Sequence, residues 1–253
     1  MKKLIIYSLT LFLLLLNTVS AAEKFVTSDY KVQTEDGFSI CATLKYPKVK
    51  NKKEFSTVVL LHSLGYNSDW WEDLPQSLLN EGYAVVTIDL RGHGKSIYNS
   101  KLNRTSWKAL TNKAFKKYPD DVITVLNYIK TENRRHFFDN WGFVGSDIGA
   151  ATSVLVANKI EYKPKTIVML SPVVNAKGLY TPVAVAELNN IDILSISGTT
   201  DYEGENSQEY LKKFAQSTFM TYISESKSNG TLILKNDKSV TPLIVKWFES
   251  YLK

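Results

Sequence analysis

Residues 141–150, with the sequence WGFVGSDIGA, constrain the fold of this chain more than any other stretch. The first of them are apolar or small, as in a buried strand, and a helical pattern begins at Ile148. Between strand and helix, Gly145 and Gly149 stand two residues before and two residues after Asp147. Glycines at this spacing leave room for a turn too tight for bulky side chains. We therefore expect Asp147 to stand at a sharp strand-to-helix corner.

This corner has the spacing of a nucleophile elbow, but its serine is missing. The usual pattern is G-x-S-x-G, in which a strained turn exposes the central serine. Here the central position is Asp147, and Ser146 lies one place out, between Val144 and Ile148. We expect the Ser146 side chain to point away from a pocket beside Asp147, because neighbouring residues of a strand point to opposite faces. The sequence thus predicts the scaffold of a nucleophile without its serine.

The N-terminus has the pattern of a secretory signal peptide. A basic start at residues 1–3 precedes a mostly apolar run at 4–16, and small residues allow cleavage after Ala21 or Ala22. The apolar run is short for a membrane span, and no cysteine directly follows it that could carry a lipid. The sequence therefore predicts a signal peptide at 1–21 and an exported chain, periplasmic or extracellular. An uncleaved N-terminal anchor is the alternative.

Length and charge predict a single domain without a nucleic-acid partner. Residues 22–253 suit one α/β domain with a full core. The formal net charge is +6, but the lysines are scattered, as on a solvated surface. Cys41 is the only cysteine, so no internal disulfide can form, and we expect it to be a small buried residue on a strand. The oligomeric state stays open.

Strand and helix patterns alternate along most of the chain. Residues 24–33 and 38–45 predict an antiparallel hairpin, because polar and apolar positions alternate on both sides of a turn. Further strands are expected at 57–61, 83–88, 143–145, 166–170, 191–197 and 220–224. Helices are expected at 69–80, 120–130, 148–159, 207–216 and 240–252. This order predicts a mainly parallel sheet covered on both faces, with the site at the carboxyl ends of the strands.

Five short sequence motifs resemble the α/β-hydrolase superfamily. They are LLHSLG at 60–65, DLRGHGKS at 89–96, the corner at 141–150, LSP at 170–172 and SGTTD at 197–201. The resemblance covers nearly the whole mature chain and is greatest to small dienelactone-hydrolase-like and serine-aminopeptidase-like members. It implies an α/β-hydrolase fold with helices on both faces of the sheet and no large cap domain. It also implies a relation to hydrolases of small esters or lactones that use no cofactor.

The resemblance assigns three triad positions. The nucleophile position falls on Asp147, and the acid that orients the histidine falls on Asp201. The histidine, which precedes a Gly-Thr pair after the last strand, falls on Asn229. The implied oxyanion hole uses backbone N–H groups of Ile148 and of either Ser63 or Leu64.

The three histidines of the chain all precede Asp147. A hydrolase of this kind needs a base to activate its nucleophile and again to activate water. His62 lies in the oxyanion-loop motif, where we expect a structural role, and His136 precedes the elbow strand at the wrong end of the sheet. His93 lies at the correct edge and is the one candidate for a substitute base.

Asp147 has two interpretations. It could be an aspartate nucleophile, as in haloalkane dehalogenases and epoxide hydrolases, which release an alkyl ester with histidine-activated water. Those enzymes carry a helical cap, whereas only about twenty residues separate the strands at 166–170 and 191–197 here. Alternatively, Asp147 is a helix N-cap, favoured by the helix dipole. Its carboxylate would then fill part of the oxyanion hole and repel a developing negative charge.

Asp201, together with Asp147 and the nearby Glu203 and Glu205, predicts an acidic pocket mouth. Two carboxylates and an Asn amide could hold a cation through their oxygens, but nothing has metal-loop spacing, so we expect no metal. Four aromatic residues flank the inferred mouth and would either line a cleft or pack in the core: Tyr66, Trp70, Trp71 and Tyr98.

The sequence favours an exported α/β-hydrolase-type protein with little or no turnover, able to bind a small molecule. The observation behind this hypothesis is that the usual serine and histidine are replaced by Asp147 and Asn229. The alternative is an active hydrolase of small esters or lactones that uses Asp147 or another arrangement.

Overall fold

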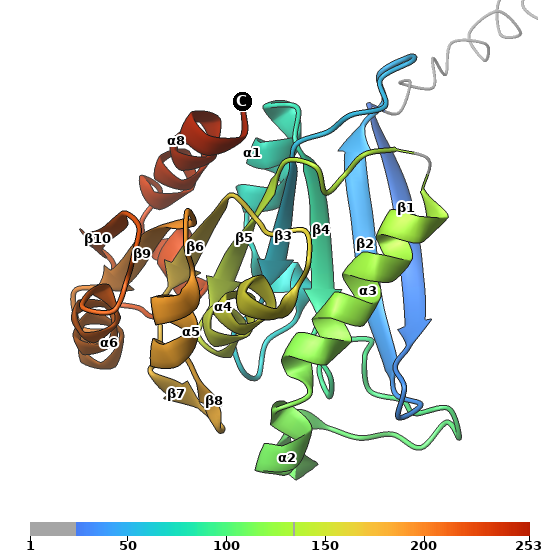
Figure 1. Cartoon of the computed structure of the whole chain (residues 1–253), viewed down its shortest axis with the longest axis horizontal. Helices are drawn as coiled ribbons and strands as arrows, with labels where there is room; N and C mark the ends of the chain where they lie inside the picture. Colours follow the sequence, from blue (N-terminus) through green and yellow to red (C-terminus); the bar gives the residue numbers. More distant parts are fainter. Residues whose placement is uncertain (1–23, 134) are drawn as a thin grey trace, which may run out of the picture.

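The structure is a computed structural model that describes residues 24–133 and 135–253 (Figure 1). The predicted signal peptide and both candidate cleavage sites lie outside the described residues. Among the helices that are described, none is long and apolar enough to cross a membrane.

The described residues form a central eight-stranded sheet in the order β1-β2-β4-β3-β5-β6-β9-β10. The strands are β1 (Phe25–Gln33), β2 (Ser39–Pro47), β3 (Thr57–Leu61), β4 (Ala84–Asp89), β5 (Trp141–Ser146), β6 (Thr166–Leu170), β9 (Asp192–Gly198) and β10 (Phe219–Ser224). β1 pairs antiparallel with β2 and β2 with β4, while all later neighbours are parallel. The predicted N-terminal hairpin and mainly parallel sheet are confirmed.

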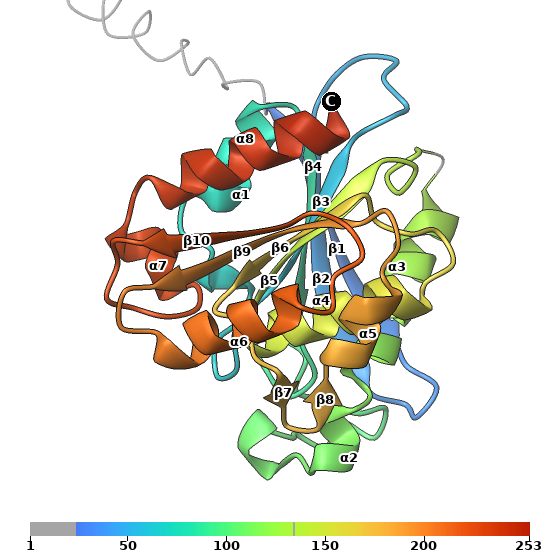
Figure 2. The ribbon, with the colours of Figure 1, turned by 60° about the vertical axis from the view of Figure 1, so that its left-hand side comes forward.

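Helices cover both faces of this sheet. They are α1 (Leu74–Asn80), α2 (Asn112–Phe115), α3 (Tyr118–Glu132), α4 (Ile148–Lys159), α5 (Pro182–Glu187), α6 (Tyr202–Lys212), α7 (Leu232–Asn236) and α8 (Val240–Leu252). Figure 2 shows α1 and α8 on one face and α3, α4, α5 and α6 on the other. Strands β3 and β6 are therefore buried along their whole length, which explains their unbroken apolar sequences.

Three predicted features differ from the structure. The helix expected at 69–80 is split into a 3-10 turn, Ser68–Trp70, and α1, because Glu72 between them has φ 50°. The helix expected at 207–216 is α6, which begins earlier because the Asp201 side chain caps it by accepting a hydrogen bond from the Gly204 N–H. Cys41 lies on β2 as expected but is only half-buried.

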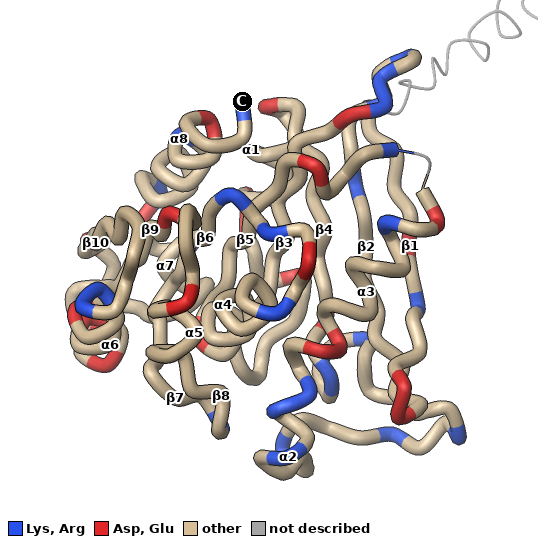
Figure 3. Tube along the Cα trace, in the orientation of Figure 1, with Lys and Arg blue, Asp and Glu red and all other residues tan. Residues whose placement is uncertain are grey.

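No large cap covers the sheet in the described part of the chain. The segment between β6 and β9 contains only the short hairpin of β7 (Asn175–Ala176) and β8 (Leu179–Tyr180), followed by α5. The Lys and Arg residues are spread over many elements around the sheet (Figure 3). The carboxyl ends of β3, β5 and β9 consequently open onto loops rather than onto a second domain.

Candidate functional site

Asp147 stands at the strand-to-helix corner between β5 and α4. Its backbone has φ 52° and ψ −116°, a conformation that L-residues adopt rarely and at an energetic cost. Both flanking glycines are needed for this turn. A Cβ on Gly149 would overlap the Leu61 carbonyl oxygen of β3, and a Cβ on Gly145 would lie 2.5 Å from the Gly149 oxygen. The chain therefore keeps the geometry of a nucleophile elbow with an aspartate at its tip.

The carboxylate of Asp147 turns towards the loop after β3. Its Oδ2 accepts a hydrogen bond from the Leu64 N–H at 3.1 Å, and its side chain makes no capping bond to α4. Asp147 thus occupies the N-cap position of α4, as expected, but its side chain does not cap the helix. The backbone N–H of either Ser63 or Leu64 was expected in the oxyanion hole. The N–H of Leu64 bonds the Asp147 carboxylate, whereas Ser63 bonds Ser146 through its hydroxyl. The Leu64 donor is already occupied by the protein's own carboxylate.

Burial is the main influence on the ionisation of Asp147. It raises the pKa of the carboxyl above the usual 3.8. The N–H groups of Leu64 and Ile148 act in the opposite direction, since they stabilise the ionised form. The nearby carboxylates of Glu203 and Asp201 raise the pKa further. The corner therefore holds a carboxylate in acidic surroundings.

Asp201 precedes α6 at the carboxyl end of β9. The residue is 8% exposed. Oδ1 caps the helix by accepting from the Gly204 N–H at 3.1 Å, while Oδ2 is buried and has no hydrogen-bond partner in the described structure. Buried carboxylate oxygens are rarely left in this state. A triad histidine would donate to an oxygen of this residue, according to the resemblance.

Asn229 follows β10 in an exposed loop. The next residue, Gly230, has φ 57°, and its N–H donates to Ser171 Oγ at 2.7 Å. Ser171 itself has φ 49° and directly follows β6. The sequence did not lead us to predict Ser171 as a site residue. Its position at the carboxyl end of β6, the strand next to β5, could have indicated that it lies at the site.

A pocket of about 200 Å³ brings the three triad positions together. Asp147, Asp201 and Asn229 all line it, together with Leu64 and Glu203. Its lining includes no Lys or Arg. Asp147, Asp201 and Glu203 thus make the pocket acidic, as the sequence suggested.

Other residues expected at the mouth lie elsewhere. Glu205 and three of the four aromatic residues do not line this pocket; of those four, only Tyr66 does. Trp71 is 1% exposed and belongs to the core with α1 and α8. Trp70 packs edge-on against Tyr66, with ring centroids 4.8 Å apart. Of the four, Trp71 is thus a core residue and Tyr66 lines the pocket, whereas Trp70 and Tyr98 are exposed outside it.

Ser146 is fully buried beneath the pocket and does not line it. Its Oγ lies 2.7 Å from Ser63 Oγ. This side chain is unavailable as a displaced nucleophile.

Both histidines near the site have structural roles. His62 is fully buried: its Nε2 accepts from the Leu90 N–H at 3.0 Å and its Nδ1 lies 2.8 Å from the Ser63 carbonyl oxygen. Burial, together with neighbouring His93, lowers the pKa of His62 to about 4. The ring is thus neutral and connects the loop after β3 to the loop after β4 by hydrogen bonds.

His93 is engaged in the same way. Its Nε2 accepts from the Gly65 N–H at 2.9 Å, and its Nδ1 lies 3.1 Å from the Arg91 carbonyl oxygen. The ring stacks on Trp107 with an interplanar angle of 4° and is 3% exposed. His93 therefore has no free nitrogen with which to serve Asp147 as a base.

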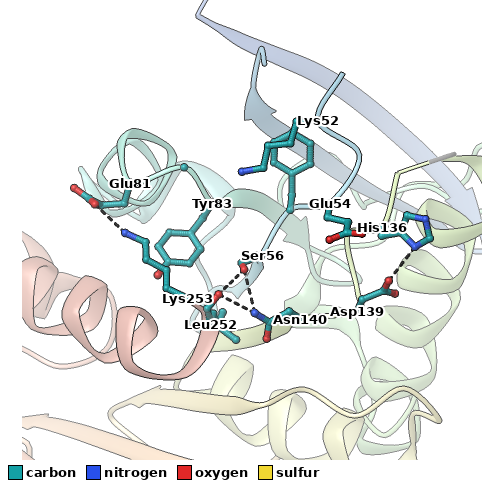
Figure 4. A pocket seen from close by; sticks show the side chains of 12 residues that line it. Lys52, Glu54, Ser56, Glu81, Tyr83, His136, Asp139, Asn140, Leu252 and Lys253 are labelled. Carbon is teal, nitrogen blue, oxygen red and sulfur yellow. Dashed lines mark hydrogen bonds and ion pairs between the residues drawn. The ribbon is translucent and has the colours of Figure 1, made fainter. Parts of the chain in front are cut away.

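His136 lies at the opposite end of the sheet, in a larger pocket of about 510 Å³ (Figure 4). This pocket is lined by residues that precede the strands, such as Ser56, Tyr83 and Asn140. His136 is paired there with Asp139 at 2.9 Å. The pocket mixes acidic and basic side chains and is remote from the elbow.

The sheet order, the elbow and the loops at the carboxyl ends of the strands define a protein of the α/β-hydrolase superfamily. The profile of one family, described as serine aminopeptidase, S33 (Hydrolase_4), matches residues 52–209. The chain belongs to this family.

One curated relative and several solved structures are similar to the chain. A Schizosaccharomyces pombe protein named "Probable lipase C14C8.15" is 26% identical over an alignment of 163 residues, and the match covers 59% of this chain and 35% of that protein. The chain thus spans about a third of the length of this relative.

The solved structures support the fold alone, because their sequences are distant. A Pyrococcus furiosus esterase has a TM-score of 0.66 at 15% identity, covering 90% of this chain and 92% of its own. A dienelactone hydrolase from Anabaena variabilis also has a TM-score of 0.66 at 15% identity, covering 90% and 99%. The acylaminoacyl peptidase of Pyrococcus horikoshii has a TM-score of 0.72 at 11% identity, covering 93% and 43%.

Proposed function

We propose that this chain is an exported α/β-hydrolase-fold protein that binds a small molecule in the elbow pocket and hydrolyses esters little or not at all. The observation that carries the proposal is the position of the Asp147 carboxylate, which accepts the Leu64 N–H at 3.1 Å. In an active relative this donor would stabilise the oxyanion of a tetrahedral intermediate. Here it is occupied by a negative group of the protein itself.

The electrostatics of the pocket support the same conclusion. An oxyanion that formed beside Asp147 would lie near a second carboxylate, Asp201, and a third, Glu203. Removal of one oxyanion-hole donor typically lowers kcat by about 10²–10³-fold, and loss of the nucleophile or base lowers it by about 10⁶-fold. The combination of these losses leaves little rate above background.

Export is supported by the basic, apolar and small-residue pattern of residues 1–22. Expression of the full chain, followed by N-terminal sequencing of the mature protein, tests this part of the proposal. A mature chain that begins at Ala22 or Glu23 supports export, whereas an intact Met1 in the membrane fraction supports the anchor.

One observation favours the alternative of an active hydrolase. Asp147 keeps the strained φ of 52° that presents a nucleophile, and it lines the pocket. An ester formed on this carboxylate would still need a base for its hydrolysis, and none of the three histidines has a nitrogen directed at it. The non-hydrolytic function is therefore the better supported.

Short-chain ester assays separate the two candidates. We expect the purified mature protein to leave p-nitrophenyl acetate and dihydrocoumarin unhydrolysed above a buffer blank, and to resist labelling by a fluorophosphonate. Glu205→Gln serves as the control variant, because Glu205 is exposed and lies outside the pocket. Clear wild-type turnover that survives in Glu205→Gln and disappears in Asp147→Asn would establish the alternative.

A further inference from the structure

We propose that β10 is an association surface through which two copies of this chain join their sheets, edge to edge and antiparallel. β10 is the last strand of the eight-stranded sheet, with β9 on one side and no described strand on the other (Figure 2). An edge strand presents a row of backbone N–H and C=O groups that can pair with another strand. The sequence of β10, the direction of its backbone groups and its side chains all suit this pairing.

The sequence of β10 lacks the features that usually keep an edge strand from associating. Natural edges are commonly protected by charged side chains, proline or bulges. Residues 214–224, which include β10, contain no charged residue, no proline and no glycine. The strand at the opposite edge of the sheet, β1, carries the exposed residues Asp29 and Lys31. Of the two edges, β10 is therefore the one that is open to another strand.

The backbone groups that point outwards belong to alternate residues of β10. On the inner side, the Ile193 N–H of β9 donates to the Thr218 carbonyl oxygen at 2.8 Å, so the backbone groups of Thr218 face β9. Successive residues of a strand direct their N–H and C=O groups to opposite sides. The groups of Phe219, Thr221 and Ile223 therefore point away from β9, where a second strand can reach them.

A two-fold axis at Thr221, perpendicular to the sheet, brings these outward groups together. With Thr221 of one copy opposite Thr221 of the other, Phe219 lies opposite Ile223, and each facing pair exchanges two backbone hydrogen bonds. On the other face of the sheet, the same register sets Met220 opposite Tyr222. Every facing pair is thus uncharged, and the apolar side chains lie opposite one another.

The side chains that this pairing covers are exposed in the single chain. Met220 is 51% exposed and Ile223 is 41% exposed. Met220 shares a face with Tyr222, which packs on the core beside α8, and Ile223 shares the other face with Phe219, which packs in the core beside α4. Association therefore removes apolar area from water on both faces of the sheet, which favours it.

A second copy suits this edge because a two-fold interface needs only one self-complementary strand. The antiparallel arrangement also directs the carboxyl ends of the two sheets in opposite directions. Asp201 and Asn229 follow the carboxyl ends of β9 and β10, so the two elbow pockets open at opposite ends of the joined sheet. Association therefore leaves both pockets accessible and is independent of the function proposed above.

Sedimentation equilibrium of the purified mature protein at micromolar concentrations tests the proposal. We expect the mass of a dimer for the wild type and that of a monomer for Thr221→Pro. Proline removes the central outward N–H, whereas the bonds to β9 come from the neighbouring residues. A monomeric wild type, or a Thr221→Pro variant that is as dimeric as the wild type, would overturn the proposal.

Ile223→Lys provides a second test if Thr221→Pro does not fold. A lysine on the exposed edge is a common protection against pairing, so we expect the dissociation constant of the dimer to rise by about tenfold or more. Val183→Lys is the matched control, because Val183 is 58% exposed and lies on α5. Equal dissociation constants for the two variants would contradict an interface at β10.

A cross-link tests the register. The Cα atoms of a hydrogen-bonded antiparallel pair lie about 5.5 Å apart, a distance that a disulfide can span. In a Cys41→Ala background, Thr221→Cys should therefore give a covalent dimer on mild oxidation. Thr27→Cys, on the exposed side of β1, should not. Cross-linking of both variants to the same extent, or of neither, would exclude the pairing at Thr221.

Discussion

At residue 147 the backbone that would present a serine holds a carboxylate against an oxyanion-hole donor. Asp147 keeps a φ of 52°, and the N–H of Leu64 is bonded to its Oδ2. A serine here would leave that N–H free for substrate. One side chain thus removes both the nucleophile and part of the oxyanion hole.

This position also makes a prediction about stability. Burial raises the pKa of Asp147 in the folded protein above the usual 3.8 of the unfolded chain. Between these two values the folded state binds more protons than the unfolded state, so stability falls as the pH rises through this window. The free-energy cost of keeping the buried Asp147 carboxylate ionised then remains at neutral pH.

We therefore expect Asp147→Asn to stabilise the protein at pH 7. Asn tolerates positive φ, and its Oδ1 can accept the Leu64 N–H. Thermal unfolding at several pH values checks this: the Tm of the variant should exceed that of the wild type at pH 7, and the gap should close towards pH 4. A gap that is the same at all pH values would show that ionisation of Asp147 is not the cause.

At the scale of elements, Arg91 ties three segments together. This side chain is 5% exposed and pairs with Asp36 of the β1–β2 turn at 2.7 Å and with Asp121 of α3 at 2.6 Å. The guanidinium holds the pKa of Asp36 well below its usual range, whereas burial raises the pKa of Asp121 to about 6. Asp36 has a second partner in Lys117 at 2.6 Å. Asp121 therefore depends on Arg91 more than Asp36 does.

Arg91→Met should accordingly destabilise the protein by about 3–5 kcal/mol at pH 7, because it leaves the Asp121 carboxylate buried without a cation. Urea unfolding measures this loss. The double variant Arg91→Met, Asp121→Leu removes the uncompensated charge as well and should recover much of the stability. A double variant less stable than Arg91→Met would contradict this account of the network.

At the scale of the whole molecule, the sequence predicted the framework of the site well. The glycine spacing around Asp147 and the positions of Asp201 and Asn229 are local patterns, and the structure places these residues around one pocket. The parallel strands could also be predicted from the sequence, because a strand that is buried on both faces is an unbroken apolar run.

Side-chain hydrogen bonds between distant segments could not be predicted in this way. The bond from Leu64 to Asp147 and the one between Ser63 and Ser146 each join residues 83 positions apart, so no local pattern reveals them. The same holds for His93, whose ring nitrogens are engaged by Gly65 and Arg91. The split of the helix expected at 69–80 depends on a local positive φ at Glu72, which the apolar periodicity does not indicate.

The central claim is that the pocket hydrolyses esters little or not at all, because the elbow carries an aspartate and the position of the base is occupied by an asparagine. Its most direct test is p-nitrophenyl acetate hydrolysis by the double variant Asp147→Ser, Asn229→His. The new serine would free the Leu64 N–H, and the new histidine would line the same pocket as Asp201, the acid position of the triad.

We expect the double variant to exceed the wild type by about 10²-fold or more and to react with a fluorophosphonate, while each single variant stays near background. A wild-type protein that hydrolyses the ester as fast as the double variant, and loses that activity in Asp147→Asn, would contradict the account.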